Sequence, residues 1–334
     1  MHPTMHPMTH PMTHPMTHKV NRPFVGIPSF LRAPICDDVA KLDAAIAVLG
    51  VPFDEGSPFL PGTRMAPRAL REHSLRFGTS GYYDPETRRQ YLEAEMTGGL
   101  IADLGDVDIR PTNVELSFEL ITSAVAGVLA RGALPVVLGG DDSITYPVVR
   151  AFDRPLYVLH FDAHTDYAPF VHGLRNTNGH AFRHVAAMTH VQGLTQIGIR
   201  SLRHGKEQIE DVFRDGNRII TMSEFRALGP TGIATLLPAE AACYVSIDVD
   251  VMDMPLVPGC VSAEPNGMSY AELRDTLGAI AERLDVVGFD FVEVNPLLDV
   301  GTGVTSYLGV HTVIEFLGRI CDQPRWRDRL AARG

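Results

Sequence analysis

The sequence has few cysteines and no long apolar run, and each shortage excludes a class of protein. Its four cysteines, at positions 36, 243, 260 and 321, stand far apart without CxxC spacing, which argues against a disulfide framework and against a cysteine zinc site. No stretch of about 18 apolar residues occurs, and no charged segment followed by an apolar one opens the chain. We therefore expect a cytoplasmic protein with neither a membrane span nor a secretion signal.

Basic residues are also in short supply. The 29 lysines and arginines are outnumbered by 40 aspartates and glutamates, so the formal charge is −11. This balance disfavours nucleic acid and anionic membranes as partners, and it favours small cationic ligands such as guanidines or amines. Apolar residues make up 45% of the 334 residues, which is enough to bury a sizeable core.

The first 18 residues repeat the unit His-Pro-Met-Thr, which sets them apart from the rest of the chain. Proline at every fourth position forbids a helix, and so biased a composition cannot bury a core. We predict a disordered arm over residues 1–20 and a single domain over residues 21–334. Because His-rich tracts can bind transition metals, that role stays open for the arm beside the role of a neutral extension.

Short apolar runs of strand type alternate with helical stretches along the remaining chain. Strands are predicted at 44–53, 134–138, 156–161, 195–199, 218–221, 242–247 and 286–294. Helices are predicted from Pro67 onward and over 115–131, 144–152, 205–214, 230–237, 269–283 and 305–320. This alternation is typical of an α/β fold with a doubly wound, mostly parallel sheet and helices on both faces. Ligands of such folds bind beyond the carboxyl ends of the strands.

Acidic residues follow four of these strands, and one histidine stands among them. In chain order they are Asp141 and Asp142, then Asp162, His164 and Asp166, then Asp248 and Asp250, and last Glu293. One carboxylate at a strand end is usually a helix cap, but four groups at one sheet edge repel each other unless cations lie between them. We therefore predict a metal site. Carboxylates mixed with imidazole suit Mn²⁺, Zn²⁺, Ni²⁺ or Fe²⁺ better than Ca²⁺.

The segments that carry these residues resemble the motifs of a known family. The chain is similar to the ureohydrolases, the family of arginase and agmatinase, in GGDDS at 139–143, DAHTD at 162–166, SIDVD at 246–250 and VEVNP at 292–296. The resemblance runs from about residue 24 to residue 320. The segments GIPSF at 26–30 and PGTR at 61–64 indicate the agmatinase and guanidinobutyrase branch of that family.

The resemblance implies an arginase-type three-layer fold that holds two divalent metal ions, with Mn²⁺ expected first and Ni²⁺ as the alternative. It assigns to the first ion Asp162, Asp166, Asp248 and the histidine of the family's GGDHS motif, whose place Asp142 takes here, and to the second ion Asp162, His164, Asp248 and Asp250. Because aspartate is shorter than histidine, Asp142 reaches the first ion only if the backbone shifts or a water intervenes. Glu293 stands at the position that contacts the guanidinium group of a small cationic substrate. The implied reaction is attack of metal-activated water on the guanidinium carbon, which releases urea and an amine. Homo-trimers or homo-hexamers are also implied.

Two departures from the family pattern concern the site. Asp142 stands where the family has the histidine of GGDHS, and Asn178 stands where many members have a histidine in the substrate loop. The extra carboxylate makes the centre more anionic, which raises the pKa of a metal-bound water and leaves less hydroxide at neutral pH. His180 is a candidate to replace the lost loop imidazole, beside its interpretation as an ordinary loop histidine.

Two functions therefore stay open. The first is a binuclear amidinohydrolase that acts on agmatine, guanidinobutyrate or another substituted guanidine. The alternative is a weakly active or inactive subunit that pairs with an intact homologue in a hetero-oligomer acting on an unusual guanidine or biguanide. Asp142 and Asn178 motivate this alternative. We expect the loops at 54–67, 167–182 and 254–268 to select the substrate.

Overall fold

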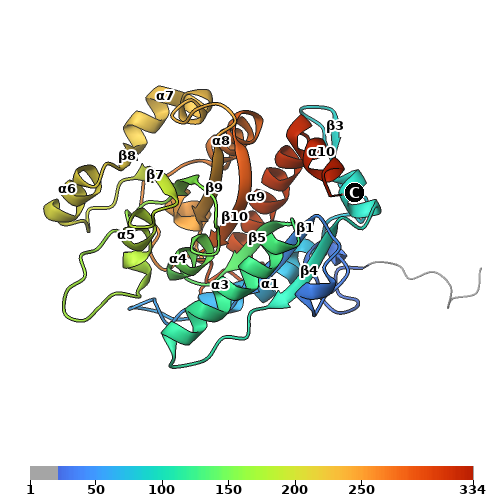
Figure 1. Cartoon of the computed structure of the whole chain (residues 1–334), viewed down its shortest axis with the longest axis horizontal. Helices are drawn as coiled ribbons and strands as arrows, with labels where there is room; N and C mark the ends of the chain where they lie inside the picture. Colours follow the sequence, from blue (N-terminus) through green and yellow to red (C-terminus); the bar gives the residue numbers. More distant parts are fainter. Residues whose placement is uncertain (1–21, 334) are drawn as a thin grey trace, which may run out of the picture.

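A computed structural model describes residues 22–333, and one eight-stranded sheet organises them (Figure 1). In chain order its strands are β1 (Ile46–Val51), β4 (Ile101–Asp106), β5 (Leu134–Gly139), β6 (Leu156–Phe161), β7 (Val191–Ile199), β8 (Arg218–Thr221), β9 (Ala242–Asp248) and β10 (Asp285–Val292). Their order across the sheet is β4-β1-β5-β10-β9-β6-β7-β8, and every neighbouring pair is parallel. The predicted parallel α/β sheet is confirmed. The arm predicted at 1–20 lies outside the described residues.

Helices cover both faces of this sheet (Figure 1). One core layer receives side chains from α1 (Ala66–Ser74), α7 (Met222–Ala234), α8 (Tyr270–Arg283), α9 (Val304–Cys321) and α10 (Pro324–Ala331). The opposite layer receives them from α3 (Val114–Ala130), α4 (Thr145–Val149), α5 (Ala181–Ala186) and α6 (Lys206–Arg214). Successive strand residues point to opposite faces, so Val136 and Leu138 enter the first layer while Val137 enters the second.

Several segments differ from the sequence prediction. The helix expected at 230–237 begins at Met222, where Thr221 and Glu224 form a capping box, and it kinks at Gly229 before Pro230. The prediction started the helix at the proline, although the turns before the kink belong to it. Strand β4 was not predicted, because its sequence contains two aspartates and a glycine. Neither were the antiparallel strands β2 (Tyr82–Asp84) and β3 (Arg89–Tyr91) or the short helix α2 (Glu93–Thr97).

The four strands that precede the acidic groups are neighbours in the sheet, in the order β5-β10-β9-β6. Leu138 lies beside Phe291, Val292 beside Asp248, and Ile247 beside Phe161. The carboxyl ends of these strands therefore reach the same height, and the residues that follow them meet at one edge. This register brings together groups that lie up to about 150 residues apart in the chain, as the hydrogen bond between Asp142 and Glu293 shows.

Within residues 22–333, no helix combines the length and the apolar character that crossing a bilayer requires.

Candidate metal centre

One group of potential ligands forms around the end of β6. The Nδ1 atom of His164 lies 3.2 Å from Oδ1 of Asp162 and 3.0 Å from Oδ2 of Asp250. These three residues are close enough to hold one metal ion. The backbone N–H of Ala163 donates to Asp250 Oδ1 at 2.9 Å, which ties the loop after β6 to the loop after β9.

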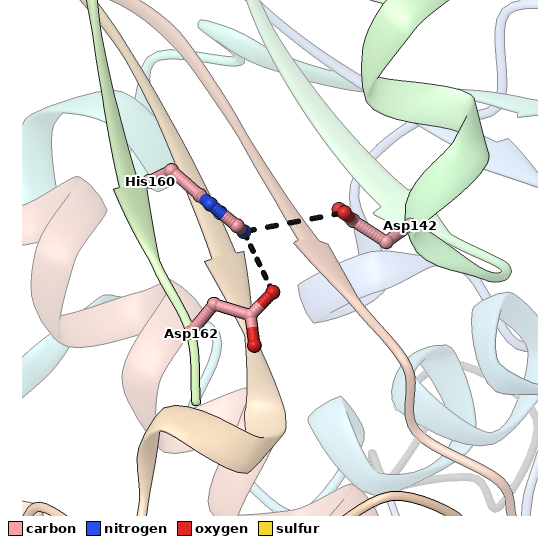
Figure 2. A group of neighbouring side chains, drawn as sticks. All are labelled: Asp142, His160 and Asp162. Atoms are coloured by element: carbon pink, nitrogen blue, oxygen red, sulfur yellow. Dashed lines mark ion pairs between the residues drawn. The ribbon is translucent and has the colours of Figure 1, made fainter. Parts of the chain in front are cut away.

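A second group of potential ligands shares Asp162 and adds Asp142 and His160. Asp142, His160 and Asp162 offer ligand atoms close enough for one ion. Figure 2 shows the Nε2 end of the His160 ring turned toward both carboxylates. The distances from Nε2 are 2.8 Å to Asp162 Oδ2 and 4.0 Å to Asp142 Oδ2. Asp162 therefore stands between two sites that are each built of carboxylates and one imidazole.

The remaining predicted ligands lie at the same edge. Asp248 and Asp250 form a third close group with Cys260, and the backbone N–H of Asp250 donates to Asp248 Oδ1 at 2.7 Å. Asp166 adopts the left-handed backbone conformation, with φ of 43°, which aspartate tolerates better than most residues other than glycine.

Burial makes this concentration of charge costly. It raises the pKa of Asp162 to about 8 and the pKa of Asp166 to about 7. Burial and repulsion between carboxylates also raise the pKa values of Asp142 and Asp248 well above the usual range. Burial alone would lower the pKa of His164, but the Asp250 and Asp162 carboxylates raise it to about 12. Negative charge at this edge therefore requires protons or cations beside it.

Unpaired atoms test whether the residues fit a metal. Among residues 22–333, four fully buried atoms that face this space approach other site atoms without making a hydrogen bond of suitable geometry: Asp142 Oδ2, His160 Nε2, Asp162 Oδ2 and Asp250 Oδ2. Buried polar atoms are nearly always paired, and these are oxygen and imidazole nitrogen atoms, which bind borderline divalent metals. The donor set therefore fits divalent cations.

Glu293 and Asn178 are hydrogen-bonded to each other and line the same cavity as the ligands. Glu293 also has a positive φ, of 64°, and its Oε1 atom accepts from the backbone N–H of Asp142 at 3.0 Å and from Asn178 Nδ2 at 3.3 Å. The Asn178 Oδ1 atom accepts from the backbone N–H of Gly179 at 2.9 Å. An uncharged amide thus stands beside the Glu293 carboxylate and holds one of its oxygens.

A cavity of about 370 Å³ opens onto these groups. Its floor is formed by His164, Asp166, Asp248, Asp250 and Glu293, and its walls include Ser57, Pro58, Phe59, Asn178, Arg203, His204, Val261 and Ser262. All three loops that were expected to select the substrate contribute to it. The Arg203 guanidinium donates to Glu264 Oε1 at 3.1 Å and contacts His164 Nε2, yet 59% of the side chain is exposed.

His180 lies apart from this cavity. Its Nδ1 atom is 2.7 Å from the Thr177 hydroxyl, its Nε2 atom is 3.3 Å from the Pro169 carbonyl oxygen, and only 4% of the residue is exposed. The ring stacks on Phe170. Both nitrogens therefore serve local contacts, and the structure does not bring His180 to the predicted ligands.

Sequence reasoning missed His160 and Arg203. His160 sits two residues before Asp162 on β6, and the alternation of strand side chains places these two on the same face. That signal was present in the sequence. No periodic signal marks Arg203, because its contact with His164 joins two loops that are 39 residues apart.

Comparison with known proteins gives one consistent result. A model of the Arginase family matches residues 44–318. Guanidinopropionase from Pseudomonas aeruginosa is 34% identical over 304 residues, which cover 88% of this chain and 92% of that protein. Proclavaminate amidinohydrolase from Streptomyces clavuligerus is 32% identical over 88% of this chain and 93% of that protein. Mitochondrial agmatinase from Gallus gallus is 31% identical over 89% and 86%.

The solved structure of the Streptomyces clavuligerus proclavaminate amidinohydrolase matches this chain with a TM-score of 0.79 and 30% identity. The match covers 90% of this chain and 99% of that one. The three-layer fold that the sequence motifs predict is thereby confirmed.

Proposed function

This chain belongs to the arginase family, and we propose on that basis that it hydrolyses a small guanidino compound to urea and an amine at a binuclear metal centre. The observation that carries the proposal is that four predicted ligands and Glu293 line one cavity, while the other two, Asp162 and Asp142, lie behind them within ligand distance of the same group. Carboxylate and imidazole ligands favour Mn²⁺, with Ni²⁺ as the alternative.

The proposed ligands divide into two sets that share carboxylates. His164 and Asp250 would hold one ion, Asp142 and Asp166 the other, and Asp162 and Asp248 both. Two divalent ions in such a site lower the pKa of a shared water, so that it becomes a nucleophile near neutral pH. The sharing of Asp162 between the group with His164 and Asp250 and the group with Asp142 supports its part in this division.

Glu293 is proposed to bind and orient the substrate. A guanidinium group is planar and presents parallel N–H bonds, which a carboxylate accepts in pairs. Because Asp142 N–H and Asn178 already hold one oxygen of Glu293, the carboxylate keeps a constant direction at the cavity floor. Asn178 is therefore proposed to position Glu293, and His180 stays an untested candidate whose contacts favour a structural role.

Arg203 suggests which guanidino compounds bind best. The cavity is acidic at its floor and carries an exposed guanidinium on its wall. A guanidino acid offers a cation to the floor and a carboxylate to Arg203, whereas agmatine would bring a second cation to the same place. We therefore propose guanidino acids as preferred substrates. The Glu264 carboxylate, which pairs with Arg203, offsets part of the positive charge that the substrate carboxylate meets.

A second candidate function follows from Asp142. A chain with a weakened first metal site would serve as a partner subunit for an intact homologue, in a hetero-oligomer that acts on an unusual guanidine or biguanide. We keep the homo-trimer or homo-hexamer as the expected assembly of the chain alone, to be measured by light scattering.

One experiment separates the two functions. The purified chain is loaded with Mn²⁺ or Ni²⁺, its bound metal is counted, and urea release is measured from agmatine, 3-guanidinopropionate, 4-guanidinobutyrate and guanidine. Two ions per chain with turnover support the hydrolase. One ion or none, without urea from any of these compounds, contradicts it and favours the partner subunit.

A further inference from the structure

We propose that His160 supplies the imidazole that this chain lacks at position 142, so that Asp142, His160 and Asp162 together hold the first metal ion. The proposal rests on the metal centre proposed above, but not on substrate turnover. Neither the family motifs nor the predicted ligand sets include His160.

The spacing of the three atoms suits one ion. Ligands about 2.1 Å from a metal lie about 3 Å apart when adjacent and about 4 Å apart when opposite in an octahedral arrangement. The Nε2 atom of His160 is 2.8 Å from Asp162 Oδ2 and 4.0 Å from Asp142 Oδ2. The same three atoms are fully buried, and within residues 22–333 none makes a hydrogen bond of suitable geometry, although Nε2 and Asp162 Oδ2 are in ion-pair contact.

Asp142 cannot approach the ion much more closely by a shift of its backbone. An added Cβ atom at Gly140 would lie 2.1 Å from the Phe53 carbonyl oxygen, so this stretch already passes as near to its neighbour as glycine allows. The backbone N–H of Asp142 is bound to Glu293 at 3.0 Å. Because an aspartate side chain is shorter than histidine, the space left in front of it must be filled from the opposite wall, where His160 stands (Figure 2).

The His160 ring is held in the required direction. It stacks on Phe182 with 3.5 Å between ring centroids and 19° between ring planes. This contact prevents the ring from turning and keeps Nε2 aimed at the two carboxylates. A rigid, preoriented imidazole loses little conformational entropy when it binds a metal.

Gln196 sets the tautomer and must respond to the metal. Its Nε2 atom lies 3.1 Å from His160 Nδ1 and also contacts the Thr165 carbonyl oxygen, so the amide now favours a proton on His160 Nε2. Coordination through Nε2 moves this proton to Nδ1, which then needs an acceptor. The Gln196 Oε1 atom is buried and has no partner within residues 22–333. We infer that the amide turns, gives up its hydrogen bond to the Thr165 carbonyl oxygen and presents Oε1 to Nδ1, which makes Gln196 a positioning residue.

The rival interpretation gives His160 a role outside the coordination sphere, as a donor of Nε2–H to Asp162. Spectroscopy of the Co²⁺-loaded chain distinguishes the two. A histidine bound to paramagnetic Co²⁺ gives a strongly shifted, solvent-exchangeable N–H proton resonance. Coordination by His160 and His164 predicts two such resonances, and a merely adjacent His160 predicts one.

Variants assign these signals and measure the cost. His160→Phe keeps the stacking on Phe182, and His160→Gln keeps a polar group. We expect each to lose one shifted resonance and to bind one of its two Mn²⁺ ions about 10- to 100-fold more weakly, the range seen when groups that support a metal are removed. His180→Phe is the matched control, because this buried histidine lies outside the cavity; it should keep both resonances. Circular dichroism of the metal-free variants checks folding.

A double variant tests whether an imidazole at position 142 can replace the one at position 160. In an Asp142→His background, the imidazole at 142 should make His160→Phe cost less than about threefold in affinity. Wild-type affinity for two ions in His160→Phe, a single shifted resonance in the wild type, or fewer than two bound ions in the wild type would each overturn the inference. Two resonances without urea release would overturn the proposed hydrolase function and leave the role of His160 intact.

Discussion

The two halves of the metal centre differ in how they are assembled, although they share Asp162. In one half, a single loop after β6 supplies Asp162 and His164, and Asp250 completes the group within 3.2 Å of His164 Nδ1. In the other half, Asp142 comes from the loop after β5 and faces His160 across 4.0 Å. The first arrangement follows the family motif and the second departs from it. We therefore expect a substitution at position 142 to alter one half of the shared site and to leave the other intact.

The difference between the two halves also shows which part of the site can change when position 142 is substituted. The backbone after β5 is tightly packed, since a Cβ atom at Gly139 would lie 2.6 Å from Val292. The side chain at 142 can therefore change in type but not in position. We expect compensation for the change at position 142 to come from β6, where His160 already presents an imidazole.

The largest expected effect removes what the two halves share. Asp162→Ala should abolish binding of both ions and lower urea release by roughly 10³-fold, equivalent to about 4 kcal/mol of transition-state stabilisation. Metal content per chain and the urea assay check it. Asp153→Ala, at an exposed residue, is the control. Retention of either ion in Asp162→Ala would show that the two halves are independent.

Removal of the metals should lower stability, because the ions bind only the folded chain. At a free Mn²⁺ concentration 100-fold above Kd, each ion stabilises the fold by about 2.7 kcal/mol. Treatment with EDTA should therefore reduce the unfolding temperature by several degrees, which differential scanning calorimetry measures. If the half that contains Asp142 binds its ion more weakly, EDTA should lower the unfolding temperature of the wild type by less than that of Asp142→His. Identical unfolding temperatures with and without EDTA would argue against a buried metal.

Asp142→His makes the two halves more alike. It should tighten binding at the first position about 10- to 100-fold, because the longer imidazole side chain reaches the ion where the shorter aspartate does not, and should leave the second position unchanged. Isothermal titration calorimetry resolves the two affinities. Asp153→His, far from the buried ligands, is the matched control. If Asp142→His leaves affinity and stoichiometry unchanged, Asp142 is not at the site.

The smallest expected effect concerns Arg203, which lines the cavity beside His164. Arg203→Gln should raise KM for 3-guanidinopropionate about threefold to fivefold, since a half-exposed ion pair contributes up to about 1 kcal/mol. The KM for agmatine should stay constant or fall. Arg154→Gln, which removes an exposed arginine elsewhere, controls for net charge. Equal changes for both substrates would exclude Arg203 as a selector of the substrate tail.

The sequence was a good guide where a strand is buried on both faces. The run Leu134–Gly139 contains no charged side chain, and its ends were predicted within one residue. The start of β7, whose first three residues are not buried, was predicted four residues too late. Strand β4 was missed because Asp103 lies inside it, where the buried Arg71 pairs with it at 2.8 Å. Such pairing depends on a helix 30 residues away, and local patterns cannot reveal it.

The site shows the same limit. The carboxylates that follow the strands could be predicted, because strand ends align in a parallel sheet. His160 was read as part of an apolar strand, although the two-residue alternation places it beside Asp162. His180 was chosen for its nearness to Asn178 in sequence, but the turn into α5 directs its ring toward Thr177 and Pro169. Direction of a side chain in a loop is a property of the folded chain.

The position of β10 governs when the centre can exist at all. Strands β4, β1 and β5 form one half of the sheet and β9, β6, β7 and β8 the other, and β10 alone pairs with both. A ribosome makes β10 last among the strands. Until it emerges, β5 and β9 each expose an unpaired edge, the state in which a nascent chain is most exposed to wrong pairing. Metal loading is therefore expected to be a late, post-synthetic event that reports completed folding.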